Sequence, residues 1–249
     1  MQVRYFLSIK LLKMQETEKK KDYIIDTLKN KSILKQKVYD NTFHTLEQIK
    51  EILKDLSKEL NHTISGADQR IKLEFTDRGI FDVQLRAAGD ILLFSMHSNI
   101  FLFDRDHPVW KTPYVQKNKF NAYTGIINIY NYLADSFKYS RLDDLGYLIA
   151  RIFINHENMF FVEGKRQIGS SFSNYGNEEI GTESLYNIIL TAIQYALDFD
   201  LLVPPYDTVK IATVGQAETK IQHSKLITGK RVGFQFNSDD VLNMNPIKT

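Results

Sequence analysis

The spacing of apolar residues changes once along this chain, between residues 61 and 70. Before the change, large apolar residues recur at intervals of three and four, the period of a helix that packs along one seam. The seam residues are Leu46, Ile49, Leu53, Leu56 and Leu60. After the change, apolar and polar residues alternate, which is typical of half-buried strands. Helical periodicity followed by strand periodicity indicates an α+β protein.

The seam needs a surface to pack against, because two heptads are too few for a free-standing coiled coil. The lysine-rich stretch 15–31 has Ile24, Ile25 and Leu28 as its large aliphatic residues and also needs a partner. The seam can pack on this stretch, on the rest of the chain or on a second copy. We expect residues 1–65 to form a helical hairpin, and we expect a protein partner or self-association through the seam.

An antiparallel sheet is expected to begin directly after the arm. Residues 70–76 and 81–86 alternate apolar and polar side chains on either side of a turn that contains Gly79. Residues 91–97 are apolar on both faces, as in a central strand, and residues 100–104 follow a polar turn. The pattern predicts a four-stranded meander.

The second half of the chain extends the sheet and adds helices. The apolar runs 147–154 and 159–164 are joined by a polar turn, which predicts a hairpin. Residues 126–138 carry a helical stripe, although their β-branched residues leave a strand open as the alternative. Thr182 is the expected N-cap of a helix, and Pro204 and Pro205 are expected to end that helix.

These patterns predict three parts: a helical arm over 1–65, an α+β core domain over 66–205 and an extended C-terminal segment over 206–249. The core is expected to hold a meander plus a hairpin, five to seven strands in all, with packed helices. Residues 105–124 contain two prolines and no sustained period, so we expect a long loop there. The C-terminal segment is expected to contain short strands at 208–214, 220–227 and 231–236.

Composition excludes several classes of protein. The chain has no cysteine, so it has no disulfide, no thiol nucleophile and no cysteine-ligated metal, and it suits a reducing compartment. No stretch approaches the roughly 20 apolar residues that a membrane-spanning helix needs, so we expect a cytoplasmic protein with no membrane partner. The formal net charge is +2, with +4 in residues 1–60 and −2 in the remainder, which makes nucleic acid a candidate partner of the arm.

The sharpest chemical motif is Glu163-Gly164-Lys165 at the end of an apolar strand. It resembles the second half of the PD-(D/E)xK nuclease signature, which implies a carboxylate that holds Mg²⁺ and a lysine that orients water. The nuclease family also needs an acid on the neighbouring strand. In the expected hairpin Asp144 lies roughly 20 Å along the strand from the residue opposite Glu163, at about 3.3 Å per residue. A salt bridge between Glu163 and Arg151 is the competing interpretation.

Two further groups carry candidate chemistry. The segment after the hairpin could hold a small anion with backbone amides, cations and hydroxyls, although its order is not that of a P-loop. Its candidate ligand-binding residues are Lys165, Arg166, Ser170 and Ser171. A carboxylate and imidazole cluster comprises His97, Asp104, Asp106 and His107. A turn at 98–99 would separate its two ends, so we expect Asp104 or Asp106 to cap backbone amides instead of binding a metal.

Tyrosines 123, 130, 132, 139 and 147, near Lys138 and Arg141, could form a stacking platform for single strands, but most fall on apolar stripes. No coherent catalytic set, metal site or cofactor motif emerges, and the six histidines lack metal-binding spacing. We therefore expect a non-catalytic interaction or regulatory module that can dimerise through its arm. The alternatives are a metal-dependent nuclease that uses Glu163 and Lys165 and a sensor of a small anionic ligand.

Overall fold

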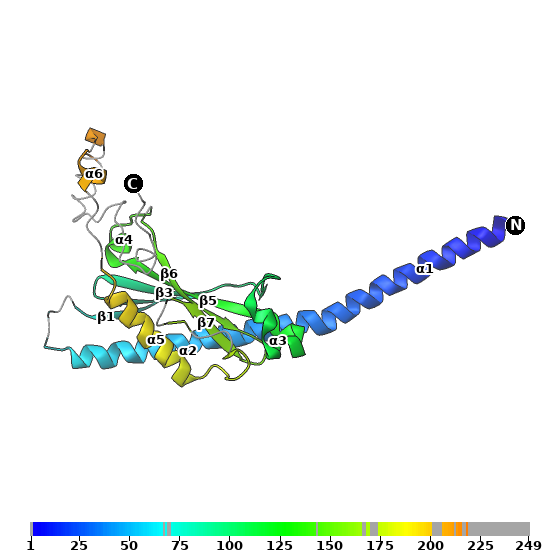
Figure 1. Ribbon diagram of the computed structural model, residues 1–249, viewed down its shortest axis with the longest axis horizontal. Coiled ribbons are helices and arrows are strands. Elements are labelled where there is room, and N and C mark those ends of the chain that lie inside the picture. Colours follow the sequence, from blue (N-terminus) through cyan, green and yellow to red (C-terminus); the bar gives the residue numbers. More distant parts are fainter. Residues whose placement is uncertain are drawn as a thin grey trace, which may run out of the picture.

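The computed structural model describes residues 2–66, 68, 71–142, 144–165, 168–169, 174–200, 206–211, 213–215 and 218, with side chains placed from Met14 onward except at 208 and 209. In this part of the chain a seven-stranded antiparallel sheet packs against helices, and one long helix extends beyond it (Figure 1). The predicted α+β class and strand number are confirmed. Among the described residues, no helix is long and apolar enough to cross a membrane.

The N-terminal part is one continuous helix, so the predicted helical hairpin in residues 1–65 is wrong. It consists of α1 (Gln2–Thr27), a π-helical turn η1 (Leu28–Ser32) and α2 (Ile33–Thr63). A helical hairpin needs a break between its two helices, and the sequence has neither glycine nor proline before Gly66. The helix therefore runs on until Ile64.

The predicted seam packs on the chain's own sheet, one of the three outcomes left open by the sequence. Leu46, Ile49, Leu53 and Leu56 are each at most 2% exposed and belong to the main core. Leu60, at the end of the seam, is partly buried against the same core. The four buried residues are therefore occupied by the core of the chain itself, so association through the arm would use other residues.

The sheet has the order β1-β2-β3-β5-β6-β7, with β4 paired to β5. β1 (Leu73–Asp77), β2 (Asp82–Ala87) and β3 (Asp90–Met96) form a meander. The predicted fourth strand of this meander is wrong, because β3 pairs with β5 on its other side. Only Phe101–Leu102 form a strand, β4, and they pair with β5 at Thr124 and Tyr123.

β5 (Tyr123–Leu133) is the central strand, so the helical interpretation of residues 126–138 holds only for the short α4 (Ala134–Lys138). β5 lies between β3 and β6 and is largely buried on both faces, and apolar residues on both faces of a strand can mimic a helical stripe. The alternative that rested on β-branched residues is the one that the structure bears out.

The segment 105–124, predicted as a loop, contains three short helices. They are η2 (Pro108–Lys111), α3 (Pro113–Lys117) and η3 (Lys119–Ala122). Each begins after a side chain that accepts a backbone N–H: His107, Thr112 and Asn118. Two of the three helices begin with proline, whose fixed φ suits a first helical position. The prolines therefore start helices here instead of marking irregular chain.

The predicted hairpin of β6 (Tyr147–Ile154) and β7 (Phe160–Gly164) is confirmed. α5 (Thr182–Leu197) begins where predicted, but Gly181 occupies the N-cap position, so Thr182 does not cap it. Residues 204–205 lie outside the described part. α6 (Tyr206–Val209) replaces the start of the strand predicted at 208–214, and the strands predicted at 220–227 and 231–236 lie outside the described residues.

Alternation along the strands divides the core between two faces of the sheet. Ile152 and Val162 belong to the main cluster, which includes the buried faces of α2 and α5. Their neighbours Phe153 and Phe161 belong to a second cluster with Val109 of the 105–124 segment. Because successive strand residues point to opposite faces, the long helix packs on one face and the three short helices cover the other.

Candidate functional site

The N-terminal part of the long helix leaves the sheet and projects away from it (Figure 1). We define the projecting segment as residues 14–37, which lie before the first buried helix residue, Val38. None of its side chains is buried. The projecting segment therefore gains no stability from a core of its own chain.

The projecting segment exposes large apolar side chains that a solvated helix does not need. Met14 is 63% exposed, Ile25 48% and Leu28 58%. Others on the same segment are Tyr23, Ile24 and Ile33. Intrinsic helix propensity contributes little stability in water, and most helical stability in proteins comes from packing of an apolar face. The segment thus has the composition of a helix that packs on something outside its own chain.

Five of its residues follow the spacing 4, 3, 4, 3 and so lie along one face. We call them the association stripe: Met14, Glu18, Lys21, Ile25 and Leu28. The Lys21 ammonium lies 2.8 Å from the Glu18 carboxylate, which places these two side chains on the same face of the helix. Tyr23, by contrast, is on the opposite side, because five residues after Glu18 the helix has turned by about 140°.

Sequence reasoning missed this stripe, although it noticed Ile25 and Leu28. The signal was the same spacing of three and four that identified the buried seam in α2. Glu18 and Lys21 interrupt it with opposite charges, so the apolar pattern alone was too sparse. The π-helical turn η1 begins at Leu28, the last residue of the stripe, and its wider turn rotates the face of the stripe relative to the face of the seam.

The base of the projecting segment is fixed to the sheet by a buried polar network. Asn41 of α2 donates a hydrogen bond of 3.0 Å to the backbone carbonyl of Asn155, in the β6–β7 turn. The Asn155 side chain is fully buried, donates to the Tyr114 hydroxyl and accepts from the amides of Glu157 and Met159. The network thus joins α2, α3 and the turn.

Burial favours the neutral forms of two ionisable groups at this junction, Tyr114 and His156. Burial, and then the hydrogen bond from its hydroxyl to the Glu157 carboxylate, raises the pKa of Tyr114 above its usual value. Burial lowers the pKa of His156, whose Nδ1 atom is enclosed and has no hydrogen-bond partner. The Tyr114 hydroxyl is thus bonded to both Glu157 and Asn155, which holds α3 to the β6–β7 turn.

At the same junction, α2 packs closely against the backbone of β5. Thr42 of α2 is fully buried against Gly125 of β5, where an added Cβ atom would lie 2.0 Å from the Thr42 Oγ1. The Thr42 hydroxyl donates to the carbonyl of Val38, one turn earlier. Only glycine leaves room for the helix at this position of the strand.

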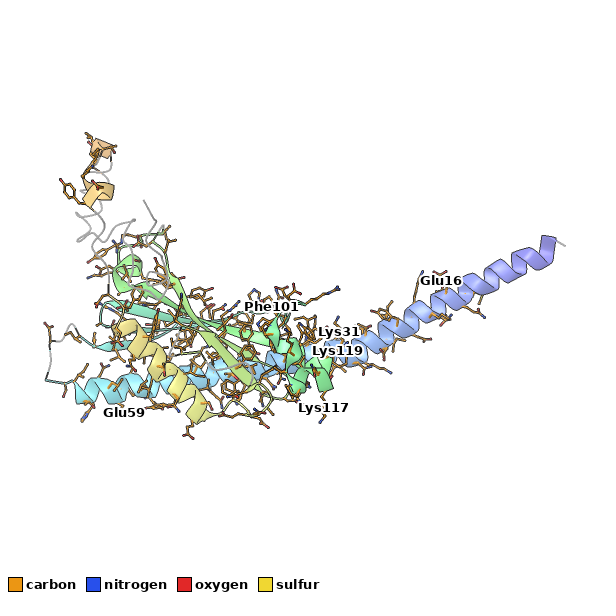
Figure 2. The ribbon with its side chains drawn as sticks, in the orientation of Figure 1. Glu16, Lys31, Glu59, Phe101, Lys117 and Lys119 are labelled. Atoms are coloured by element: carbon orange, nitrogen blue, oxygen red, sulfur yellow. The ribbon has the colours of Figure 1, made fainter. Side chains whose placement is uncertain are left out.

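Lysines gather where the helix leaves the sheet. The Nζ atoms of Lys31 and Lys35 lie 5.6 and 5.5 Å from the ring centroid of Tyr123. Tyr123 directly follows η3, which carries Lys119 and the 41% exposed Phe120. Figure 2 shows Lys31 and Lys119 at this junction. Within the described residues, no ion pair joins Lys31, Lys35 or Lys119 to a carboxylate.

The candidate nuclease residues do not converge on a metal. Glu163 lies directly opposite Arg151 in the β6–β7 ladder. Its carboxylate accepts hydrogen bonds from the Arg151 guanidinium, and the bond from Nε is 2.7 Å long. The salt bridge predicted as the competing interpretation is therefore present. Asp144 instead accepts from Ser136 and pairs with Arg141. Among the described residues, no group of three or more histidine and carboxylate side chains could hold a metal ion.

The proposed anion-binding residues are only partly described. The backbone amide of Lys165 donates to the carbonyl of Ile149, which fixes the first residue of the segment to β6. Arg166, Ser170 and Ser171 lie outside the described residues, so this site stays a prediction.

The pairing from which the separation of the carboxylate and imidazole cluster was predicted is absent, because β3 and β4 each pair with β5 and not with each other, and the capping residue also differs. The ring nitrogen of His97 accepts from the amide of Asn99. The ring nitrogen of His107 caps the amide of Val109, so the histidine, and neither Asp104 nor Asp106, is the capping side chain. Asp104 contributes its backbone carbonyl, which accepts from the Trp110 indole.

The tyrosines proposed as a stacking platform have other contacts. Tyr130 and Tyr132 lie against each other, and Tyr147 lies against Phe199. Lys138 lies over Tyr139, with its Nζ atom 5.1 Å from the ring centroid. These rings belong to strand surfaces and local contacts and do not form one continuous platform.

Comparisons of the chain with protein-family models, with curated proteins and with solved structures gave no match.

Proposed function

We propose that this protein is a non-catalytic interaction module whose projecting segment is a self-association device. The observation that carries the proposal is the exposure of Met14, Ile25 and Leu28 on a helix segment that has no buried residue. Burying such side chains is favourable by about 1.5–3 kcal/mol each, which is enough for three or four of them to hold a reversible dimer. A cytoplasmic location belongs to this proposal, and the cysteine-free sequence supports it.

The structure of the base supports this proposal. A helix that served only as a solvated tail would not need anchoring, yet Asn41, Thr42 and the buried Asn155 fix it to the sheet. An anchored helix keeps one direction relative to the body, which lowers the entropy lost on association. The sheet domain, which we call the head, thus holds the helix in a fixed orientation.

The triple variant Met14→Gln, Ile25→Gln, Leu28→Gln tests the proposal by light scattering across a concentration series. We expect the unsubstituted chain to gain mass with concentration and the variant to stay at the mass of one chain. The variant should keep its thermal stability, because the three side chains contact no core. The matched control is Tyr23→Gln with Ile33→Gln, which removes exposed apolar groups outside the stripe. Equal loss of mass in the control would contradict a specific stripe.

A second candidate function rests on the lysine cluster at the base. The segments 28–39 and 107–134 contain seven lysines and no acidic residue, and the contact of Lys31 and Lys35 with Tyr123 brings the segments together. Unpaired lysines beside the exposed ring of Phe120 suit a single-stranded nucleic acid, whose phosphates and bases they would contact. We propose that this surface, which we call the lysine surface, binds such strands.

Fluorescence anisotropy with a labelled single-stranded oligonucleotide tests the lysine surface. We expect Lys31→Gln, Lys35→Gln, Lys119→Gln to weaken binding and to reduce the slope of log K against log salt by about 2, since each phosphate contact contributes about 0.7. The control removes the same charge from lysines that pair with acids: Lys58, Lys72 and Lys210. An equal loss in both variants would show that net charge alone drives binding and would contradict the assignment.

A further inference from the structure

We infer that the partner of the projecting segment is a second copy of this chain, aligned antiparallel about a two-fold axis between positions 19 and 20. This inference rests on the proposed self-association and adds the orientation and the register of the two helices. Its evidence is the order of charged and apolar residues along the association stripe.

The charges at the centre of the stripe select the antiparallel orientation. In a parallel pair, equivalent residues face each other, so Glu18 would oppose Glu18 and Lys21 would oppose Lys21. Like charges at facing positions are destabilising. In the antiparallel pair with its axis between 19 and 20, Glu18 of each helix faces Lys21 of the other. The two residues already lie 2.8 Å apart within one helix, so four alternating charges would meet at the centre.

The apolar residues fit the same axis without adjustment. Met14 and Ile25 are equidistant from it, so each Met14 faces Ile25 of the other copy, on both sides of the charged centre. The next positions of the same register are 11 and 28, and both are leucine in the sequence. Two apolar pairings and one charged pairing, each of which occurs twice in the dimer, thus share one midpoint, as a self-complementary two-fold contact requires.

The sheet domains do not obstruct this register. Val38 is the first residue of the long helix that the sheet buries, and it lies ten residues beyond Leu28. At 1.5 Å per residue, Val38 lies about 15 Å beyond the outermost of these pairings, and Lys31, the first helix residue that contacts the sheet domain through Tyr123, lies about 4.5 Å beyond it. The two heads would lie at opposite ends of the paired helices, so contact between the heads is not needed.

Cysteine cross-linking of the full chain tests the register, because the native sequence has no cysteine that could interfere. One chain carries Met14→Cys and a second carries Ile25→Cys, and disulfides form under mild oxidation only where Cβ atoms approach to about 4 Å. We expect the mixture to cross-link about tenfold faster than either chain alone, since pairing raises the local concentration of the two thiols. Tyr23→Cys, on the opposite face and 72% exposed, measures random collision.

The outcomes separate the register from the proposed function. Fast linking in the mixture, with each single chain at the Tyr23→Cys rate, supports the antiparallel register. Fast self-linking of both single chains indicates a parallel pair, which overturns the register and leaves self-association standing. No linking above the control while the chain sediments as a dimer overturns the register in the same way. No linking from a chain that sediments as a monomer overturns both.

Charge exchange gives a second readout that does not depend on thiols. Lys21→Glu would place four carboxylates at the centre of the pair, and Glu18→Lys would place four ammonium groups there. We expect each variant to self-associate about tenfold more weakly than the native chain, from several like-charge contacts of a few tenths of a kcal/mol each. Mixing the two variants should restore association. Unchanged self-association of both would overturn the charged centre.

Discussion

Replacement of Gly125 by alanine is expected to lower the free energy of unfolding by about 3 kcal/mol, the upper part of the usual range for overpacking. An alanine Cβ would lie 2.0 Å from the Oγ1 and 2.8 Å from the Cβ of Thr42, so no rotation of the threonine hydroxyl relieves the clash. The helix α2 must then move away from β5 and loosen the main core. Urea unfolding followed by circular dichroism measures the loss.

Two companion variants identify the clash as the cause. Gly89→Ala is the control, because nothing lies within 4 Å of its added Cβ atom, and its stability should be near that of the native chain. Thr42→Gly in the Gly125→Ala background removes the obstructing side chain and should recover part of the loss, less about 1 kcal/mol for glycine in a helix. Equal stability of Gly125→Ala and Gly89→Ala would contradict the packing of α2 against β5.

Replacement of Leu53 by alanine is expected to lower the free energy of unfolding by about 2–5 kcal/mol, as for other buried leucines. Leu53 is fully buried between α2 and the sheet, so the change leaves a cavity inside one chain. The loss should not depend on protein concentration, because no second copy contributes to that core. Thermal unfolding at several concentrations measures it.

Leu28→Ala is the matched comparison, since it makes the same substitution in the same long helix at a 58% exposed position. It should leave the unfolding of the core unchanged and weaken association instead. If Leu53→Ala were mild and depended on concentration, the seam of α2 would be an interface between chains, contrary to its burial in the core.

The local spacing of apolar residues predicted most of the fold. The hairpin of β6 and β7 followed from two apolar runs and a polar turn. Its register places Glu163 opposite Arg151, one residue from Ala150, near which the expected turn had placed it. The helical hairpin failed because the periodicity located the helical residues but could not show that 2–63 continue without a break. β5 was ambiguous because burial on both faces of a strand removes the alternation that distinguishes it from a helix.

The association stripe could be recognised only after the structure had separated buried from exposed residues. In the sequence, Ile25 and Leu53 belong to similar patterns, and only the fold shows that one is exposed and the other is in the core. This difference in burial also determines which variants can test association. A chain that began at Gly66 would lack Leu46, Ile49 and Leu53 and so much of the core, which is why substitutions in the projecting segment, and no truncation, test association.

Sedimentation equilibrium of the unsubstituted chain, from low micromolar to millimolar concentration, tests self-association most directly. We expect the apparent mass to rise from that of one chain, 29.0 kDa, towards that of two, and we expect the variant Met14→Gln, Ile25→Gln, Leu28→Gln to abolish the rise. An apparent mass of one chain across the whole range would contradict it.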